Sequence, residues 1–270
     1  MATPRLFLDT NVCEKLSSPA HGFDSQGIVQ RLADKFSIVV SPRSLFELLQ
    51  GVVGGTTDEH LRSDQTKLLT LLGHQRPTFL ELPGHFALRT VLGVISSVPC
   101  MTPTDFVQIV TTVGAARSLR ELFDGKVRIP GDSTATYGLD RNIVAAEKEE
   151  DSKTHREWLS FAKERTDNFG TPEAWAYLVG VAHGVRLTDM QNMYFAKCLS
   201  AAFEYERTNF NIAANNPNLN IGKRDSDWGD FQQLFYLCDP SLHLLTDDEG
   251  IRTKCKASEQ SKRIILLKEA

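Results

Sequence analysis

The first hydrophobic run of the chain, Leu-Phe-Leu at 6–8, leads without a break into the polar residues Asp9, Thr10 and Asn11. A short, continuous apolar run is typical of a strand that is buried on both faces of a parallel sheet. Because the run ends abruptly in a carboxylate, we expect the strand to deliver Asp9 to the carboxyl end of the sheet, where ligands bind in such folds.

A helix and a second strand follow this run. Apolar residues between 27 and 36 recur at helical spacing, after a shorter predicted helix over 12–16. The β-branched run at 37–40 then predicts a strand. Strand, helix and strand in this order are the opening of a parallel α/β sheet.

The second strand leads directly into a further predicted helix. Ser41 followed by Pro42 is a strong start signal, because Ser caps the first N–H groups and Pro fits the first helical position. This helix carries one early acid, Glu47, which we expect to point at the sheet edge. Ser44 and Glu47 also match the S-x-x-E capping box, so a purely local role for Glu47 stays open.

The middle of the chain has a different character. From about 56 to 207 the pattern is mostly helical and interrupted by prolines, and the asparagine-rich stretch at 209–227 predicts a loop. We therefore expect a discontinuous α/β core formed by 1–54 and 224–270, with a mostly helical insertion at 55–223.

Strand signals return near the C-terminal end. A helical pattern over 227–237 precedes an apolar strand at 242–246, which is followed at once by Asp247 and Asp248. A last strand is predicted at 264–267. These elements complete an α/β fold with a parallel sheet.

Composition narrows the classes of partner. The net charge is −4 and the sequence pI is about 6.0, so any nucleic-acid contact must come from a local patch. Five cysteines, an odd number with no C-x-x-C spacing, fit a reducing compartment and provide no zinc framework. No run approaches the roughly 18 apolar residues of a membrane span, and no signal-peptide pattern precedes the first strand. We expect a cytoplasmic protein with no membrane partner.

Four acids occupy comparable places in the predicted fold. Asp9 and Asp248 follow predicted strands, and Glu47 and Asp230 lie early in helices next to strands. In a parallel sheet these places converge on the carboxyl edge. Carboxylates gathered there repel one another unless cations lie between them, and Mg²⁺ or Mn²⁺ takes oxygen ligands of this kind. The arrangement predicts metal-assisted phosphodiester hydrolysis.

These residues and their spacing resemble the PIN-domain nuclease family. The motifs are Leu-Asp-Thr-Asn-Val at 8–12, Ser41 with Glu47-Leu48, and Asp230 followed by Thr246-Asp247-Asp248. The resemblance covers 1–53 and 226–270, so more than half of the chain lies outside it.

The resemblance implies a three-layer α/β/α core and a metal-dependent nuclease. The acidic quartet would bind Mg²⁺ or Mn²⁺ and cut RNA, or sometimes DNA, leaving 5′-phosphate ends. Many proteins of this kind are toxins that cleave tRNA or mRNA, and others process RNA or defend against phage. The resemblance leaves open whether a second copy of the chain or a protein inhibitor is a further partner.

Supporting residues follow from the same motifs. We interpret Asn11 as a partner that orients Asp9, or as a simple turn residue. Ser41 and Thr246 complete the motifs as supporting groups.

Two of the acids have an alternative nearby. Asp227 shares a helical face with Asp230, and the spacing to Thr246 favours Asp230 as the ligand. Asp247 is the alternative to Asp248, and either could instead cap the next helix.

The basic and aromatic residues near the motifs have two interpretations each. Arg43, Lys223 and Arg224 are candidates for phosphate contacts, or are solvated side chains. Trp228 is a candidate for stacking on a base, or packs against the core.

Two other functions compete with a nuclease. A phosphatase of the haloacid-dehalogenase type also opens on a strand-end Asp, but it requires a second Asp where this chain has Asn11. A PIN-like scaffold that binds RNA or a protein without cutting is the non-enzymatic alternative, and such scaffolds usually lack one or more of the acids.

Overall fold

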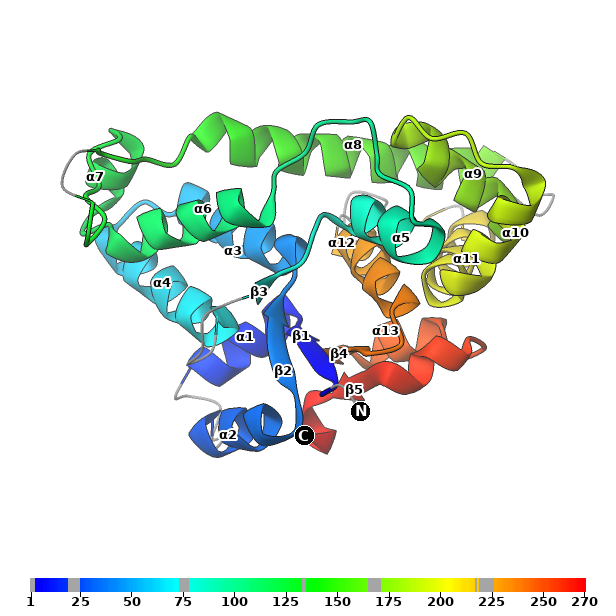
Figure 1. Cartoon of the computed structure of the whole chain (residues 1–270), viewed down its shortest axis with the longest axis horizontal. Helices are drawn as coiled ribbons and strands as arrows, with labels where there is room; N and C mark the ends of the chain where they lie inside the picture. The colour runs from blue at the N-terminus through cyan, green and yellow to red at the C-terminus, as the bar shows by residue number, and fades with distance from the viewer. Residues whose placement is uncertain are drawn as a thin grey trace.

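A five-stranded, all-parallel sheet in the order β3-β2-β1-β4-β5 runs through the molecule (Figure 1). The structure is a computed structural model that describes residues 3–18, 25–72, 78–132, 135–164, 171–216, 218 and 226–270. The strands are β1 (Arg5–Leu8), β2 (Ser37–Val40), β3 (Thr78–Phe79), β4 (Leu242–Thr246) and β5 (Ile264–Leu266).

The first strand of the chain is the centre of the sheet. Leu6 of β1 is in register with Ile38 of β2 on one side and with His243 of β4 on the other. Successive residues of β1 point to opposite faces, so Leu6 and Leu8 join one hydrophobic core and Phe7 joins the other. The predicted parallel α/β sheet is thus confirmed, and its central strand ends at Asp9.

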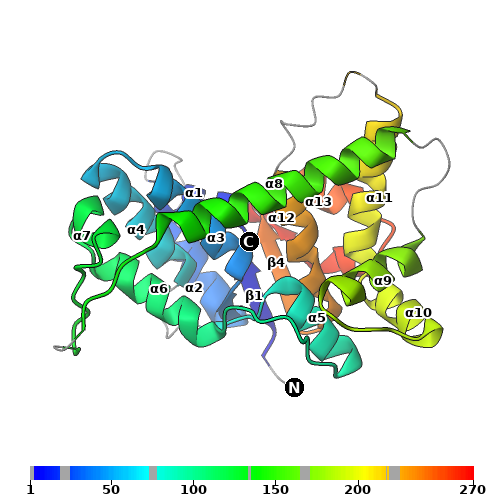
Figure 2. The same cartoon turned by 90° about the horizontal axis from the view of Figure 1, so that it is seen from above.

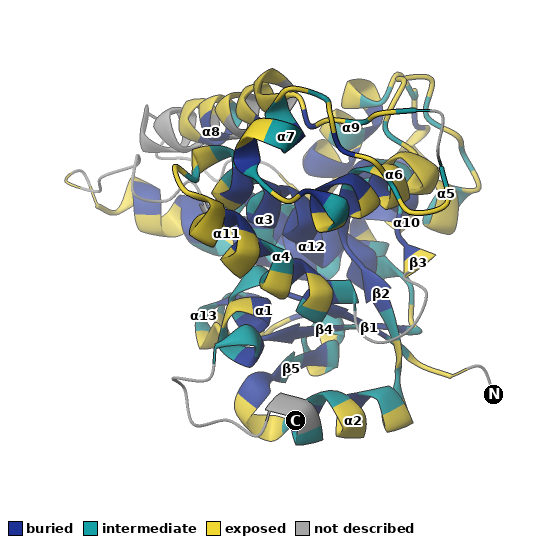
Figure 3. Ribbon diagram, turned by 90° about the vertical axis from the view of Figure 1, so that its left-hand side faces the viewer, coloured by how far each residue is buried: buried dark blue, intermediate teal, exposed yellow. Residues whose placement is uncertain are grey.

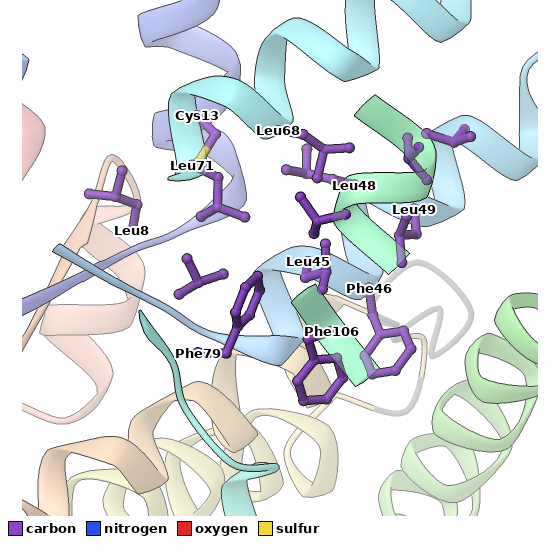
Figure 4. Close-up of a cluster of buried hydrophobic side chains, with 14 of the residues drawn as sticks. Leu8, Cys13, Leu45, Phe46, Leu48, Leu49, Leu68, Leu71, Phe79 and Phe106 are labelled. Atoms are coloured by element: carbon purple, nitrogen blue, oxygen red, sulfur yellow. The ribbon is translucent and has the colours of Figure 1, made fainter. Parts of the chain in front are cut away.

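One group of helices covers the face that receives Leu6 and Leu8. Figure 4 shows part of this core, in which Leu45, Phe79 and Phe106 pack together. The helices are α1 (Thr10–Ser17), α2 (Ser25–Lys35), α3 (Pro42–Gly54), α4 (Asp58–Leu72), α6 (Pro103–Ala115) and α7 (Leu119–Phe123).

A second group covers the face that receives Phe7, and its core is rich in aromatic residues. A long helix, α8 (Arg141–Glu164), crosses over both groups and packs on α3 (Figure 2). Figure 3 shows buried residues concentrated on the sheet and on the inner sides of the helices. The second group comprises α5 (Pro83–Leu92), α9 (Pro172–Ala182), α10 (Asp189–Cys198), α11 (Ser200–Ala214), α12 (Ser226–Gln233), the 3₁₀ helix η3 (Leu234–Cys238) and α13 (Glu249–Lys254), and the 3₁₀ turns η4 (Glu259–Arg263) and η5 (Leu267–Glu269) flank β5.

The segment predicted as a helical insertion differs from expectation in one respect. It contributes β3, whose Thr78 and Phe79 pair with Val39 and Val40 at the edge of the sheet. A strand of two residues is too short for alternating polarity to reveal it, which is why the sequence pattern missed it. No helix in the described parts of the chain is both long and apolar enough to cross a membrane.

A buried hydrogen bond fixes α3 against the end of β1. The Ser44 hydroxyl donates to the Leu8 carbonyl oxygen over 2.7 Å, and the Ser44 side chain is fully buried. Because Leu8 immediately precedes Asp9 and Ser44 lies one helical turn before Glu47, this bond sets the distance between the two segments that carry the acids.

Replacing Ser44 by Ala should lower the free energy of unfolding by about 1–2 kcal/mol, because it removes a buried hydrogen bond and leaves its carbonyl partner less satisfied. Urea denaturation measures the change. Ser17→Ala is the matched control, since the Ser17 hydroxyl donates to the Glu14 carbonyl oxygen at the surface. Its effect should stay within about 0.5 kcal/mol, and equal losses in both variants would contradict a special role for Ser44.

Candidate functional site

Asp9 lies at the carboxyl end of the central strand and is only 4% exposed. Its Oδ1 accepts hydrogen bonds from the Thr10 backbone N–H over 2.7 Å and from the Gln233 amide over 3.3 Å. Its Oδ2 accepts from the Thr246 hydroxyl over 2.7 Å. Three neutral donors therefore fix the orientation of this carboxylate without neutralising its charge.

Thr246 and Asn11 connect the ends of the two central strands. The Thr246 hydroxyl oxygen also accepts from the Asp248 backbone N–H over 3.0 Å and from the Asn11 amide over 3.5 Å. The Asn11 side-chain oxygen accepts from the Asp247 backbone N–H over 3.1 Å. Asn11 thus acts on Asp9 through Thr246, by holding the end of β4.

Glu47 approaches from α3. Ser41 is the N-cap of this helix and accepts from the Arg43 backbone N–H over 3.2 Å, so the alternative capping box centred on Ser44 is not formed. Beyond the first turn, Glu47 accepts a hydrogen bond from the Thr10 hydroxyl. The contact places Glu47 beside the residue that follows Asp9.

Gly229 allows α12 to approach this carboxylate. A Cβ atom at this position would lie 2.7 Å from Glu47 Oε1 and 3.4 Å from the nearest guanidinium nitrogen of Arg43. The first distance is closer than atoms tolerate, so a side chain here would force Glu47 away. The glycine is needed for close approach rather than for an unusual backbone conformation.

The two acids of α12 have different environments. The Tyr205 hydroxyl, from α11, lies 2.9 Å from Asp230 Oδ2 and 3.2 Å from Asp227 Oδ1. Asp227 also forms an ion pair with Lys254 of α13 at 3.3 Å. The cation balances the charge of Asp227, whereas Asp230 faces the other acids.

Electrostatics link Asp230, Asp9 and Glu47. Burial raises the pKa of Asp230 well above its usual value, and the charges of Asp9 and Glu47 raise it further. Burial also raises the pKa of Asp9, and the charge of Asp248 adds to the shift. The structure therefore brings these acids into one electrostatic cluster at the sheet edge.

Asp248 and Asp247 follow β4 and differ in their contacts. Asp248 is exposed and is the N-cap of α13, where its carboxylate accepts from the Gly250 backbone N–H over 2.6 Å. Asp247 forms an ion pair with Lys15. Of the two, only Asp248 contributes to the raised pKa of Asp9.

The basic residues singled out from the sequence occupy different situations. The Arg43 side chain is only 5% exposed, so it is not a freely solvated contact for a phosphate. Lys223 and Arg224 lie outside the described residues.

Several groups at the site were not selected from the sequence. Gln233 stands three residues after Asp230, and its helical spacing is a signal that could have identified it. Tyr205 and Lys254 come from segments outside the motifs, and only the folded arrangement brings them to Asp227.

The donor set suits a hard cation. A carboxylate offers about four lone-pair positions. Asp9 uses three of them for protein donors, which leaves one on Oδ2. Among the described residues, no three His, Cys, Asp or Glu side chains are already drawn together as a ligand set. The carboxylates of Asp9, Glu47 and Asp230 are hard oxygen donors of the kind that Mg²⁺ or Mn²⁺ takes, but in this structure they do not form a ligand set.

Comparisons of the chain with known protein families, with curated proteins and with solved structures find no significant match.

The raised pKa values predict how stability depends on pH when divalent metal is removed with EDTA. A carboxyl group whose pKa is raised in the folded protein stabilises the fold fully when the pH is below its ordinary pKa of 3.8. This stabilisation is lost as the pH rises through the raised pKa. Asp230→Asn should therefore raise the melting temperature, and by more at about pH 8 than at about pH 5.

Asp227→Asn is the matched control for this measurement. Asp227 belongs to the same helix and contacts the same tyrosine, but it is paired with Lys254. Its replacement should lower the melting temperature at about pH 8, because it leaves a cation without its partner. Destabilisation of the same size by both variants would show that Asp230 is not under electrostatic strain.

Proposed function

We propose that the protein is a metal-dependent endonuclease that hydrolyses phosphodiester bonds, with RNA as its substrate. The observation that carries the proposal is the convergence of Asp9, Glu47 and Asp230 at the carboxyl edge of a parallel sheet. Burial and mutual repulsion raise the pKa of two of these acids, which is the electrostatic setting that a divalent cation relieves.

The residues that would hold the cation are Asp9, Glu47 and Asp230, with Asp248 at the margin of the cluster. Such an ion, when bound, activates a water molecule for attack and stabilises the charge that develops on the phosphoryl oxygens. A carboxylate set with no histidine or thiolate favours Mg²⁺ or Mn²⁺ over zinc.

The remaining residues of the site position the acids. Thr246, Gln233 and the Thr10 backbone hold Asp9 in one orientation through neutral hydrogen bonds, so its negative charge stays available. Tyr205 donates to Asp230 and restricts it in the same way. Support of this kind is what a metal site needs, because the orientation of each ligand sets the geometry of the bound ion.

The proposal includes a PIN-like fold. Its support is the all-parallel sheet with helices on both faces, together with the order of the motifs: Asp9 after β1, Glu47 in α3, and Asp230 and Asp248 on either side of β4. The remaining helices, α4 to α11, would shape the surface that selects the substrate.

Cleavage of nucleic acid tests the proposal directly. The purified protein is incubated with structured RNA, single-stranded RNA and single-stranded DNA in Mn²⁺ or EDTA, and fragment ends are mapped. We expect RNA to be cleaved in Mn²⁺ and not in EDTA, and the fragments to carry 5′-phosphate ends. Asp9→Asn and Asp230→Asn should lower the rate at least about 100-fold, since loss of even a supporting group around a metal costs up to that much.

Asp189→Asn is the control for the loss of an acid, because Asp189 is exposed at the start of α10. It should cleave at the wild-type rate. Cleavage that survives in Asp9→Asn, or that never appears with metal, would overturn the proposal. In the second case the non-cutting scaffold becomes the better account.

Metal binding can be measured without a substrate. At about 100 times its dissociation constant, Mn²⁺ should stabilise the folded protein by about 2.7 kcal/mol, equivalent to about 5–10 °C in melting temperature for a chain of this size. Calorimetry or thermal fluorescence records the shift. Asp230→Asn should melt higher than the wild type in EDTA and lose most of the response to Mn²⁺, which separates loss of the site from loss of the fold.

A further inference from the structure

Two helices at one end of the molecule, α9 and α10, pack side by side and expose large apolar side chains (Figure 2). Their exposed fractions range from 41% for Leu178 to 82% for Met190. Within each helix, spacings of three or four residues place these side chains on one helical face. The exposed stripe of α9 consists of Tyr177, Leu178 and Val181, and that of α10 consists of Met190, Met193 and Tyr194.

The two stripes form one surface, because each helix buries its opposite side in the same core. Ala176 of α9 and Phe195 and Ala196 of α10 are almost fully buried in the core that receives Phe7. The exposed stripes therefore both point away from this core. Since the helices lie side by side, the six exposed side chains share one surface, which we call the α9–α10 face.

The composition of these helices indicates that the α9–α10 face is covered in solution. A helix that is apolar on all sides is normally buried on all sides. The only charged residue of α9 is Glu173, at its start. In α10, Phe195 is buried on one side while Met190 and Met193 are exposed on the other. Apolar surface of this kind is typical of a contact with another molecule.

The size of the α9–α10 face fits one side of a protein–protein interface. At about 200 Å² for each large side chain, the six residues, which are on average about half exposed, present about 600 Å². This equals about the largest patch found on typical monomers, which is about 300–600 Å². A standard interface takes about 800 Å² from each partner, and somewhat more than half of that is apolar. The face therefore supplies the apolar part of such an interface.

The α9–α10 face also carries no net charge when histidine is counted as neutral. Over α9, α10 and the turn between them, the acids Glu173 and Asp189 balance the bases Arg186 and Lys197. The chain as a whole has a net charge of −4, so two copies repel each other least where these neutral surfaces meet. A strongly acidic or basic partner would find no complementary charge here.

The positions of two of these charges favour a two-fold arrangement. Asp189 lies in the first turn of α10 and Lys197 in its last turn, four residues before and four residues after Met193. When two copies of α10 pack antiparallel about Met193, Asp189 of each copy faces Lys197 of the other. Exposed pairs of this kind add little affinity, but they fix the register of a contact.

We propose that two copies of the chain associate through the α9–α10 face, with a two-fold axis beside Met193. The apolar surface supplies the affinity, and the charge balance and the reciprocal positions of Asp189 and Lys197 identify the partner as a second copy. In such a contact the same surface serves both subunits. The inference does not depend on the proposed function.

The mass of the protein in solution tests the association. Sedimentation velocity is recorded over about 1–100 µM, a range that brackets a dissociation constant of moderate strength. We expect a single species that approaches twice the chain mass of 30.1 kDa at the upper end. The dissociation constant should be below about 10 µM.

Met193→Glu and Met193→Lys test the location and the symmetry. In either variant the two-fold axis brings like charges together, so association should weaken at least about 30-fold. An equal mixture of the two variants brings a carboxylate opposite an ammonium group and should restore the dimer, with one copy of each. Met193 is 62% exposed, so neither change disturbs the core.

Leu69→Glu is the matched control, because Leu69 is 65% exposed on α4, outside the α9–α10 face. This variant should associate as the wild type does. Circular dichroism should be the same for all variants, which shows that a change in mass is not a loss of folding.

Each contrary result has a definite meaning. A wild type that stays monomeric over the whole range overturns the inference and assigns the face to a partner of another kind. Unchanged association in both Met193 variants, or equal loss in Leu69→Glu, also overturns it. A mixture of the Met193 variants that stays monomeric overturns the two-fold arrangement. None of these results bears on cleavage of nucleic acid, so the proposed function is judged separately.

Discussion

Mutual repulsion among buried carboxylates is the constraint on which the rest of this structure depends. Asp9 and Asp230 are held close to each other and to Glu47, and burial removes the water that would otherwise screen them. Thr246 and Gln233 donate neutral hydrogen bonds to Asp9, and Tyr205 donates one to Asp230. The ionised form of Asp230 is disfavoured as a result, because burial and the charges of Asp9 and Glu47 act on it together.

The sequence predicts the parts of the site that are local, and it does so for physical reasons. An apolar run that ends in Asp9 and a Ser-Pro helix start leave a clear pattern, and both occur where they were expected. The parallel sheet follows from the alternation of strands and helices. Spacing favours Asp230 over Asp227 as a ligand, which stays a prediction, and in the structure Asp227 forms an ion pair with Lys254.

What could not be predicted depends on contacts between distant segments. Tyr205 stands in a helix with no motif, and nothing in its neighbourhood indicates that it lies against two aspartates. The same is true of β3, which is recognisable only by its pairing with β2. Gly229 appears in the sequence as an ordinary helical glycine, and its importance emerges only when Glu47 is found against it.

The segment expected to be an insertion is part of the structure of the site. Its helix α11 provides the Tyr205 hydroxyl that donates to Asp230, its helices α5 and α9 line a cavity together with α12, and its helix α8 packs on α3 and α12. Removing it would uncover both hydrophobic cores and take away the Tyr205 hydroxyl that donates to Asp230. The elements that carry the motifs therefore do not make a complete site by themselves.

The central position of β1 also has a consequence for the order in which the protein is made. β1 leaves the ribosome first, but its neighbour β4 and the Asp9 partners Gln233 and Thr246 come more than 220 residues later. Until residue 246 has emerged, the central strand has an open edge, and such edges promote aggregation. During the same interval Asp9 lacks the groups that orient it. The arrangement of hydrogen bonds around Asp9 can therefore be completed only after β4 has been made.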